Sequence, residues 1–209
     1  MQETQVKLTV DARLLHMAVK FAAVRDVRYY LQGVNVRRAA SGYDDGVVIE
    51  ATDGHTACVI YDAGGRSTEK GAIIKSELVK KLPKSGKVSI LSDETMYVGE
   101  SGFIDMESLS GLIYKAATID GNFPIVNRVF PDFTQLNPGI VSSMINQDYL
   151  LRGFNFFSEF QAGKNKWNGV RCFQNYENSS ILMASAHCNA FVLVMPMMNE
   201  KEIIRPSWL

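Results

Sequence analysis

Apolar residues along this chain fall mostly into short alternating runs, separated by a few stretches with helical spacing. An alternating run at 6–10 leads through Asp11, a favourable helix N-cap, into helical spacing from Ala12 to about Val24. Three more alternating runs follow, at about 28–37, 46–51 and 56–62. This order predicts a unit made of one strand, one helix and three strands.

The same order recurs in the next part of the chain. A predicted strand at 71–74 is followed by Ser76 as N-cap and by a short helix that ends before Pro83. Alternating runs come next, at about 87–91, 95–99, 102–108 and 112–118. We therefore expect a second unit of the same kind.

A third copy of the pattern begins near residue 140. The run at 140–145 leads to Asn146 or Asp148 as N-cap and to a helix that ends near Phe160. Helical spacing predicts the buried face of this helix as Leu150, Leu151, Phe154 and Phe157. Strands near 168–174, 180–186 and 190–197 would complete the unit.

A single unit of this kind cannot bury both faces, because its helix covers one side of a sheet whose edges stay open. Two units pair into a domain. The repeats thus predict an α+β fold, with helices on one face of antiparallel sheets. Prolines and a glycine between 130 and 139 interrupt the pattern, so we expect a full domain at 1–131 and a smaller one at 132–209.

Composition limits the classes of function. The chain has 209 residues, of which 46% are apolar and 10% aromatic, enough to bury a core. Its 22 basic and 22 acidic residues cancel, so any DNA contact must come from how charge is distributed. Cys58, Cys172 and Cys188 lack C-x-x-C spacing, so we expect free thiols and no metal or cofactor. The chain contains neither a membrane-length apolar run nor a signal-like start, which predicts a cytoplasmic protein.

The sequence contains no recognisable catalytic motif. His16, His55 and His187 are far apart, and neither G-x-S-x-G, H-E-x-x-H nor P-loop spacing occurs. We therefore predict a protein that is not an enzyme.

Two distant segments resemble a known family. An R-x-x-L-x-G-V pattern at 28–34 leads to Ala51-Thr52-Asp53-Gly54-His55, and a late run reads Val194-Met195-Pro196-Met197. Both are similar to the bacterial DNA polymerase III beta subunit, the DNA sliding clamp, in its middle domain and its closing strand. Asp120-Gly121-Asn122-Phe123-Pro124 is similar to the family's D-G-x-F-P linker, and Gly169-Val170-Arg171 to its G-V-R strand.

The resemblance implies the DNA clamp fold and a processivity factor that encircles or cradles duplex DNA and tethers a polymerase. It covers 6–131 as one clamp domain, whereas 138–198 is much shorter than the family's third domain. Ring closure in the family needs six domains, or twelve units. Two compressed domains per chain would close a ring as a homotrimer, but three units per chain would not. So compact a form would suit a phage or prophage gene.

A clamp needs a cationic inner wall, because Lys and Arg contacts to phosphates give affinity without reading sequence. The predicted DNA-facing residues are Arg13, Lys20, Lys80, Lys81, Lys84, Arg152, Lys164 and Lys166. Ordinary solvated helix faces are the alternative interpretation of the same positions.

The family also has a groove that takes short apolar peptides from polymerases and clamp loaders, held by a few apolar anchors. Carried over by motif, this groove would be lined by Thr52, Gly54, His55, Thr56, Pro124, Arg128, Val129, Val194, Met195, Pro196 and Met197. Core packing of Met195 and Met197, and a plain turn role for His55, are the alternatives. Thr56-Ala57 stands where the family usually has Arg-Leu, which removes a cation and changes partner specificity.

Two further hypotheses concern partners. The run at 202–209 has apolar residues on both sides of a proline, and we expect it to occupy the protein's own groove or that of a neighbour. The rival to the sliding clamp is an adaptor that keeps the fold and the groove but binds replication proteins without sliding on DNA. A single-strand-binding module is a third reading, weakly supported by Tyr29, Tyr30 and Trp167.

Overall fold

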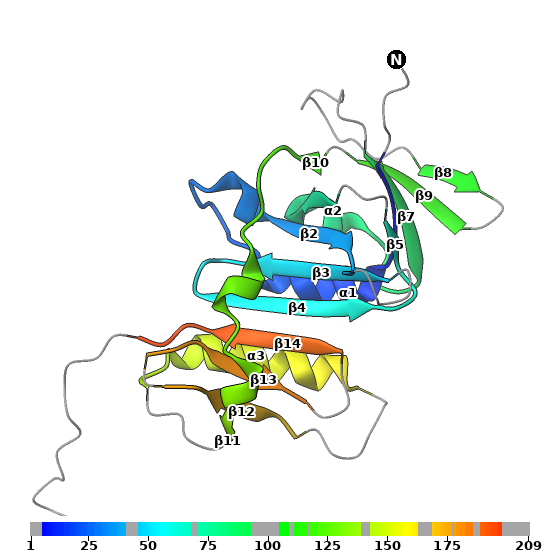
Figure 1. Cartoon of the computed structure of the whole chain (residues 1–209). Coiled ribbons are helices and arrows are strands. Elements are labelled where there is room, and N and C mark those ends of the chain that lie inside the picture. The colour runs from blue at the N-terminus through cyan, green and yellow to red at the C-terminus, as the bar shows by residue number, and fades with distance from the viewer. Residues whose placement is uncertain are drawn as a thin grey trace, which may run out of the picture.

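The computed structural model describes most of the chain in several stretches. They are residues 6–40, 46–67, 71–92, 105–108, 111–116, 118–138, 143–162, 169–176, 178–185 and 189–197. Within them the strands form one sheet of nine and one of five (Figure 1). Every strand pair in the described part is antiparallel except β7 (Lys87–Ser92) with β9 (Gly111–Ala116).

The first unit closely follows its sequence prediction. It comprises β1 (Val6–Asp11), α1 (Ala12–Ala18), β2 (Gly33–Arg38), β3 (Val47–Thr52) and β4 (Thr56–Asp62). Asp11 is confirmed as N-cap, since its side chain accepts from the backbone N of Arg13 at 2.8 Å. The strand expected from residue 28 begins later, because Tyr29–Gln32 forms the 3₁₀ turn η2. A second 3₁₀ turn, η1 (Val19–Phe21), continues α1.

The second unit contains β6 (Ala72–Lys75), α2 (Ser76–Lys81), β7, β8 (Asp105–Ser108) and β9. Ser76 is not the N-cap as expected; Lys75 holds that position. The Ser76 hydroxyl instead donates to the carbonyl oxygen of Gln32 at 2.7 Å, which ties α2 to the first unit. The strand expected at 95–99 lies outside the described residues, and two short strands, β5 (Arg66–Ser67) and β10 (Thr118–Ile119), extend the sheets.

The third unit consists of α3 (Gln147–Phe160), β12 (Arg171–Gln174), β13 (Ile181–Ala184) and β14 (Ala190–Val194). Asn146 is confirmed as N-cap, because its side chain accepts from the backbone N of Asp148 at 2.9 Å. A two-residue strand, β11 (Asn137–Pro138), pairs with the outer side of β12. The strand expected at 140–145 lies largely outside the described residues.

The first two units exchange strands. The first strand of unit one, β1, pairs with β7 of unit two, and the first strand of unit two, β6, pairs with β2 of unit one. Each unit thus closes an open edge of the other, which is the pairing expected for two units of one domain.

The nine-stranded sheet passes through the predicted domain boundary. Its order is β10-β6-β2-β3-β4-β14-β13-β12-β11, so β4 of the first unit pairs with β14 of the third. Helices α1 and α3 lie against one face of this sheet, and the segment from β10 to β11 crosses the other (Figure 1). That segment includes two 3₁₀ turns, η3 (Val126–Val129) and η4 (Phe133–Gln135).

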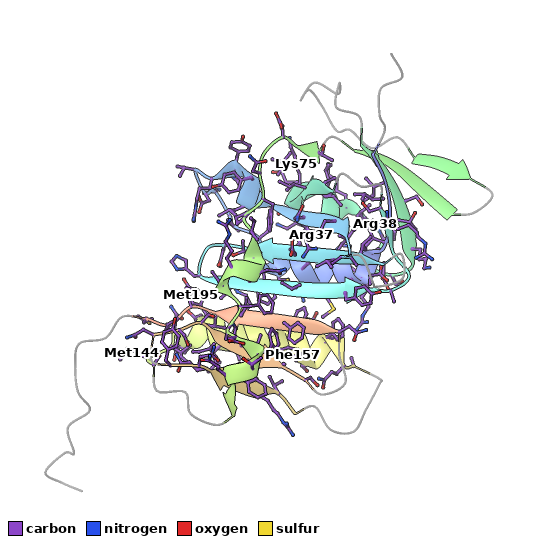
Figure 2. All side chains as sticks on the ribbon, in the orientation of Figure 1. Arg37, Arg38, Lys75, Met144, Phe157 and Met195 are labelled. Carbon is purple, nitrogen blue, oxygen red and sulfur yellow. The ribbon has the colours of Figure 1, made fainter. Side chains whose placement is uncertain are left out.

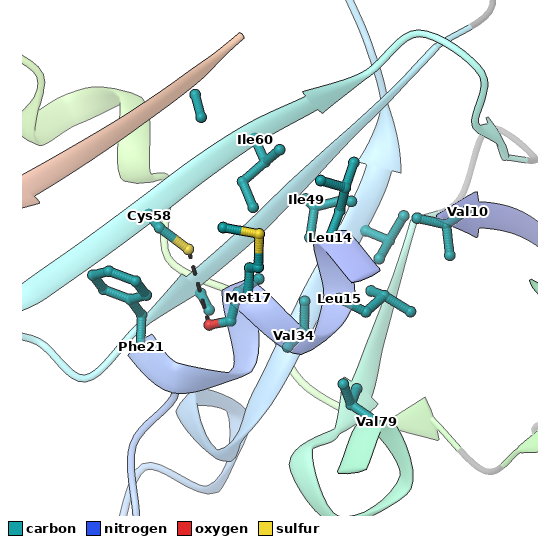
Figure 3. Packing of buried hydrophobic residues seen from close by; sticks show 14 of the residues in the cluster. Val10, Leu14, Leu15, Met17, Phe21, Val34, Ile49, Cys58, Ile60 and Val79 are labelled. Atoms are coloured by element: carbon teal, nitrogen blue, oxygen red, sulfur yellow. Dashed lines mark hydrogen bonds between the residues drawn. The ribbon is translucent and has the colours of Figure 1, made fainter. Parts of the chain in front are cut away.

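The main core lies between the helices and the sheet (Figure 3). Phe21 from η1 meets Phe156 from α3 edge to face, with ring centroids 5.6 Å apart. Cys58 is fully buried among these residues and the pKa of its thiol is raised by burial. A smaller cluster on the opposite face joins Ala57, Leu182 and Leu193 to Val126 of the crossing segment. The linker is therefore packed against the sheet.

Candidate functional site

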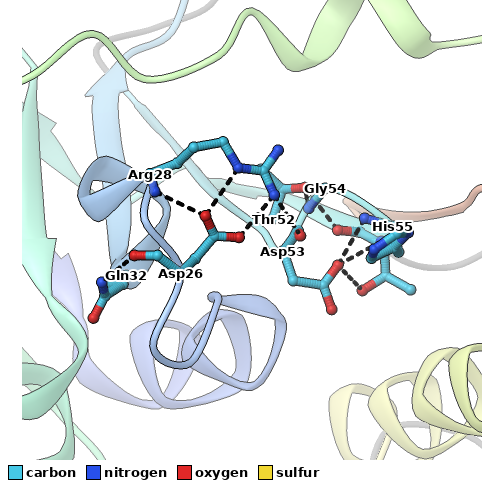
Figure 4. A network of polar contacts seen from close by, with 8 residues as sticks. Asp26, Arg28, Gln32, Thr52, Asp53, Gly54 and His55 are labelled. Carbon is cyan, nitrogen blue, oxygen red and sulfur yellow. Dashed lines mark hydrogen bonds and ion pairs between the residues drawn. The ribbon is translucent and has the colours of Figure 1, made fainter.

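The turn between β3 and β4 is built around one carboxylate (Figure 4). Oδ1 of Asp53 accepts from the backbone N of His55 at 2.9 Å, the backbone N of Thr56 at 2.7 Å and the Thr56 hydroxyl at 3.0 Å. The Thr52 hydroxyl donates to the Thr56 carbonyl at 2.8 Å and accepts from the backbone N of Gly54 at 3.0 Å. Gly54 has φ +90°, a backbone conformation that favours glycine.

Arg152 of α3 fixes this turn from the helix side. Its Nη1 donates to Oδ2 of Asp53 at 2.6 Å and to the Thr56 hydroxyl at 2.8 Å. Its guanidinium also lies over the rings of Phe21 and Tyr149, at 5.9 and 5.6 Å from their centroids. Thr56 itself carries no charge, but the guanidinium of Arg152, 96 positions along the chain, lies within hydrogen-bond distance of its hydroxyl.

The pKa of Asp53 reflects this environment. Burial alone raises the pKa of the carboxyl, but hydrogen bonds from the Thr56 amide, the Arg152 side chain and the His55 amide outweigh burial. The pKa is therefore lowered from its usual 3.8, and the ionised form holds the turn at neutral pH.

Arg28 approaches the turn from the opposite side. It donates to Asp26 through Nε at 3.0 Å and through Nη2 at 2.7 Å, and this pairing lowers the pKa of Asp26 to about 2. Its Nη2 also reaches the carbonyl oxygen of Asp53 at 3.5 Å. A Cβ at Gly54 would lie 3.0 Å from the same nitrogen, so the close approach suits a glycine.

A pocket of about 200 Å³ opens beside this turn. It lies where the turn, the crossing segment and the end of β14 meet. Its lining residues are Arg28, Leu31, Thr52, Gly54, His55, Thr56, Ala57, Pro124, Ile125, Val126, Val129, Leu193 and Met195. We call this hollow the turn pocket. Ile125, Val129 and Met195 are 59%, 42% and 37% exposed, so its rim presents apolar side chains to solvent.

The structure brings seven of the predicted groove residues together in the turn pocket, from three distant parts of the chain. They are Thr52, Gly54, His55, Thr56, Pro124, Val129 and Met195. Val194 is instead fully buried under the helices, because side chains alternate along β14 and Leu193 takes the pocket side. Arg128, Pro196 and Met197 lie outside the lining.

Sequence reasoning missed part of the lining. Ile125 and Val126 sit in the linker between positions that were identified, and Leu193 precedes Val194. These residues were omitted because the prediction used the family's sequence motifs, which do not include every residue that faces the pocket. Strand alternation alone could have selected Leu193 over Val194.

Surface apolar groups continue beside the pocket. The ring of His55 stacks on the ring of Tyr149, with centroids 5.6 Å apart. The backbone carbonyl oxygen of His55 accepts from the backbone N of Met195 at 2.9 Å. Met197 forms an isolated bridge with Met144, donating through its backbone N at 2.8 Å. Met195 and Met197 are both exposed, which excludes core packing as their role (Figure 2 shows Met144 and Met195).

Three predicted DNA-facing cations are engaged within the protein. Nη2 of Arg13 donates to the backbone carbonyl oxygens of Glu159 and Phe160, at the C-terminal end of α3. Lys20 pairs with the Glu159 carboxylate at 2.5 Å. Arg152 is held by Asp53. These contacts join α3 to the first unit.

The remaining predicted cations divide into two groups. Lys80 and Lys81 of α2, together with Lys84 just beyond it, are exposed. Lys164 and Lys166 lie outside the described residues. Helix α3 carries one basic residue, Arg152, against the acidic Asp148 and Glu159, so its own surface is not cationic. Lys80 and Lys81 thus add exposed positive charge on α2, whereas the exposed Lys20 is paired with Glu159.

Among the described residues, no group of three His, Cys, Asp or Glu could hold a metal ion. No described helix is long and apolar enough to cross a membrane.

Comparison with known proteins finds no matching family model and no matching curated protein. Solved structures do match. The DNA polymerase sliding clamp from Pseudomonas aeruginosa is 16% identical, with a TM-score of 0.62, over 95% of this chain and 68% of that one. The sliding clamp from Bartonella birtlesii bound to griselimycin is 17% identical, with a TM-score of 0.61 over 95% and 68%.

A third similar structure is the DNA polymerase III subunit beta from Borrelia burgdorferi in complex with a natural product. It is 12% identical, with a TM-score of 0.62 over 91% of this chain and 63% of that one. The chain therefore spans about two thirds of the length of these proteins. At such low identity the likeness shows the fold, and the predicted clamp fold is confirmed.

Proposed function

We propose that this protein is a sliding-clamp-like processivity factor, without catalytic activity, that acts in DNA replication in the cytoplasm. The observation that carries the proposal is the turn pocket. A clamp fold brings the turn at 52–56, the linker at 124–129 and the end of β14 into one apolar hollow that the sequence resemblance had assigned to peptide binding.

The pocket suits a short peptide with apolar side chains from a DNA polymerase or a clamp loader. Leu31, Val126 and Leu193 form a buried floor, and the exposed Met195 gives an adaptable rim. A few apolar anchors in such a preformed hollow carry most of the energy of peptide recognition. His55 and Arg28 add polar groups at the rim.

Griselimycin, seen bound to the Bartonella birtlesii clamp, is a probe for this pocket. Calorimetry should detect its binding to the whole chain, and Met195→Ala should weaken binding about tenfold through lost apolar contact. Tyr176→Ala, at a residue 72% exposed and outside the lining, is the matched control and should bind normally. Equal affinity for all three proteins would show that the ligand binds elsewhere.

A second candidate function is the adaptor that binds replication proteins without sliding on DNA. It is favoured by the engagement of Arg13, Lys20 and Arg152 in internal contacts, which leaves less positive charge for phosphates. The two functions differ in DNA binding. A sliding clamp should stay on linear duplex DNA with both ends blocked and leave when one end is freed, whereas an adaptor should bind griselimycin yet show no end dependence.

A further inference from the structure

A second and larger hollow lies on the face of the nine-stranded sheet that the crossing segment covers. It encloses about 780 Å³, against about 200 Å³ for the turn pocket. Its walls combine apolar strand residues, three phenylalanines of the crossing segment and β14, and a few polar side chains. We call it the aromatic pocket. Ligand sites typically have volumes of roughly 300–1,000 Å³ and walls of this composition.

Strand register fixes the floor of the aromatic pocket. Arg37 is paired with Val48, Val48 with Tyr61, and the backbone N of Tyr61 donates to the carbonyl oxygen of Asn189 at 2.8 Å. These four positions form one row across β2, β3, β4 and the start of β14. Because neighbouring strands lie about 4.8 Å apart, the row spans about 14 Å. The hollow is therefore long enough for several residues of an extended chain.

The aromatic pocket is separate from the turn pocket. The floor of the turn pocket includes Ala57 and Leu193, which are paired with each other farther along the same face of β4 and β14. None of the described residues lines both hollows. A ligand of the aromatic pocket is thus recognised by a different set of side chains.

Three phenylalanines form the apolar middle of the pocket. The ring of Phe130 stacks on that of Phe133, and both meet the ring of Phe191 edge to face, with all three centroid distances at 5.9 Å. Phe133 is nevertheless 55% exposed. Oδ1 of Asp132 caps its turn, η4, by accepting from the backbone N and the hydroxyl of Thr134 at 2.9 and 2.7 Å. An exposed ring that is already held in place loses little entropy when a ligand binds.

A cation stands at the β2 end of the pocket. Arg37 donates to the carboxylate of Glu50 through Nη2 at 2.8 Å and Nε at 3.2 Å, and Asn35 donates to the same carboxylate at 2.9 Å. The Arg37 side chain is 35% exposed and that of Glu50 only 4%, so the guanidinium faces outward. Apolar residues can often replace a buried ion pair without loss of stability. The pair is therefore better explained by the cation that it holds at the wall of the pocket.

An anion stands at the other end. Asp132 directly precedes Phe133, whose ring contacts Phe191 of β14, whereas Arg37 lies on β2, three strands away. Among the described residues no ion pair joins Asp132 to Arg37. Hydrogen bonds from Thr134 lower the pKa of Asp132, so its carboxyl is charged at neutral pH. The pocket thus has a positive end, an aromatic middle and a negative end.

We propose that the aromatic pocket binds an extended segment of a partner protein in which an aromatic residue lies between an acidic and a basic residue. The acidic side chain faces Arg37, the ring packs on Phe133, and the basic side chain faces Asp132. The amides of Asn127 and Asn189 line the same hollow and suit the backbone of the segment. In an extended chain the first and fifth Cα atoms are about 14 Å apart, which matches the row of the floor. The inference does not rest on the proposed function.

Fluorescence anisotropy of labelled peptides, with the whole chain as receptor, tests the proposal. The probe has five residues, with glutamate and lysine at its ends, phenylalanine in the middle, alanine between them, and acetyl and amide caps. It is made in both orders, because the direction of the segment is not fixed by the charges alone. One order should bind with a dissociation constant of about 0.1 mM, and alanine in place of the phenylalanine should weaken binding about fivefold. No binding of either order would overturn the proposal.

Two variants locate the binding. Phe133→Ala alters an exposed ring and should weaken binding about fivefold, whereas Tyr176→Ala, at a residue 72% exposed and outside the hollow, should leave it unchanged. Asp132→Asn keeps an oxygen to cap η4. It should weaken binding of the lysine peptide about threefold but not of a peptide with glutamine in that place. Arg37 stays unaltered, since its loss would leave Glu50 buried without a cation.

Equal affinity for Phe133→Ala and the unaltered chain would contradict the proposal. So would an equal loss for both peptides with Asp132→Asn. Both variants should bind griselimycin as the unaltered chain does, because neither residue lines the turn pocket. Failure of the peptides and failure of griselimycin are therefore separate results, the first for this inference and the second for the proposed function.

Discussion

The contact between Arg152 and Asp53 gives the sharpest test of how the turn pocket is held. Replacing Arg152 with Met keeps an unbranched apolar stem but removes hydrogen bonds of 2.6 and 2.8 Å to Asp53 and Thr56. Asp53 would then remain partly buried with a charge that has lost its cation, its side chain being 17% exposed. We expect the turn to loosen, although Arg152 itself does not line the pocket.

The magnitude follows from the geometry. Hydrogen bonds to charged groups contribute about 1.5–3 kcal/mol, and the 32% exposure of the Arg152 side chain lets solvent screen part of this. We therefore expect Arg152→Met to reduce the free energy of unfolding by about 1–2 kcal/mol. Lys20→Met removes an exposed pair, 47% and 52% accessible, and should cost less than about 0.5 kcal/mol.

Urea denaturation measures the coupling between Arg152 and Asp53 directly. It is applied to the single variants, including Asp53→Asn, and to the double variant Arg152→Met with Asp53→Asn. The losses from Arg152→Met and Asp53→Asn should not add, because both remove the same interaction. Griselimycin affinity should fall with Arg152→Met and recover partly with Arg152→Lys, which restores a cation. Additive losses, or an Arg152→Met cost equal to that of Lys20→Met, would refute the reasoning.

Three other predictions follow from the same region. Gly54→Ala places a Cβ at φ +90° against Arg28 and should lower the free energy of unfolding by about 1 kcal/mol, measured by thermal denaturation. Because the folded pKa of Asp53 is lowered, its contribution to stability is complete above about pH 4 and is lost as pH falls through the folded value; Asp53→Asn should flatten that part of the stability profile. Deleting residues 200–209 should strengthen griselimycin binding if this segment occupies the pocket, and unchanged affinity in calorimetry would remove that role.

Local signals in the sequence were sufficient for most of the elements that the structure describes. Asp11 and Asn146 precede helical spacing and are N-caps in the structure, and the bounds of α3 match the prediction closely. Caps and turns depend on residues within a few positions of one another, so a single sequence carries their information. Ser76 was wrongly predicted as an N-cap. Its hydroxyl donates instead to Gln32, 44 positions away, and the residues around Ser76 do not indicate a bond over that separation.

It was harder to predict which side of a helix is buried and which residues make long-range contacts. The prediction that Leu151 and Phe154 lie on the buried face of α3 was wrong: they are 56% and 42% exposed, whereas Phe156 and Phe157 are buried. All four side chains are apolar. Spacing alone therefore does not decide which side of α3 packs on the sheet, because that depends on the neighbouring elements. Likewise, nothing near Arg152 in the sequence indicates that its partner is Asp53, 99 positions away. Long-range contacts of this kind are set by the tertiary fold.

The candidate site was predictable where a motif spans adjacent residues. The turn at 52–56 and Pro124 were found this way, and the structure places them at one pocket. The surroundings of the predicted DNA-facing cations were less predictable. Helical spacing placed Arg13 and Lys20 on one side of their helix, but it carried no information that Glu159 and the end of α3 occupy the space opposite them.

Electron microscopy of the whole protein, at the concentration where its mass is constant, tests the central claim most directly. A clamp should appear as a closed ring with a channel wide enough to pass a DNA duplex. Particles without a channel at every concentration, in a protein that still binds griselimycin in the turn pocket, would contradict the sliding clamp and favour the adaptor.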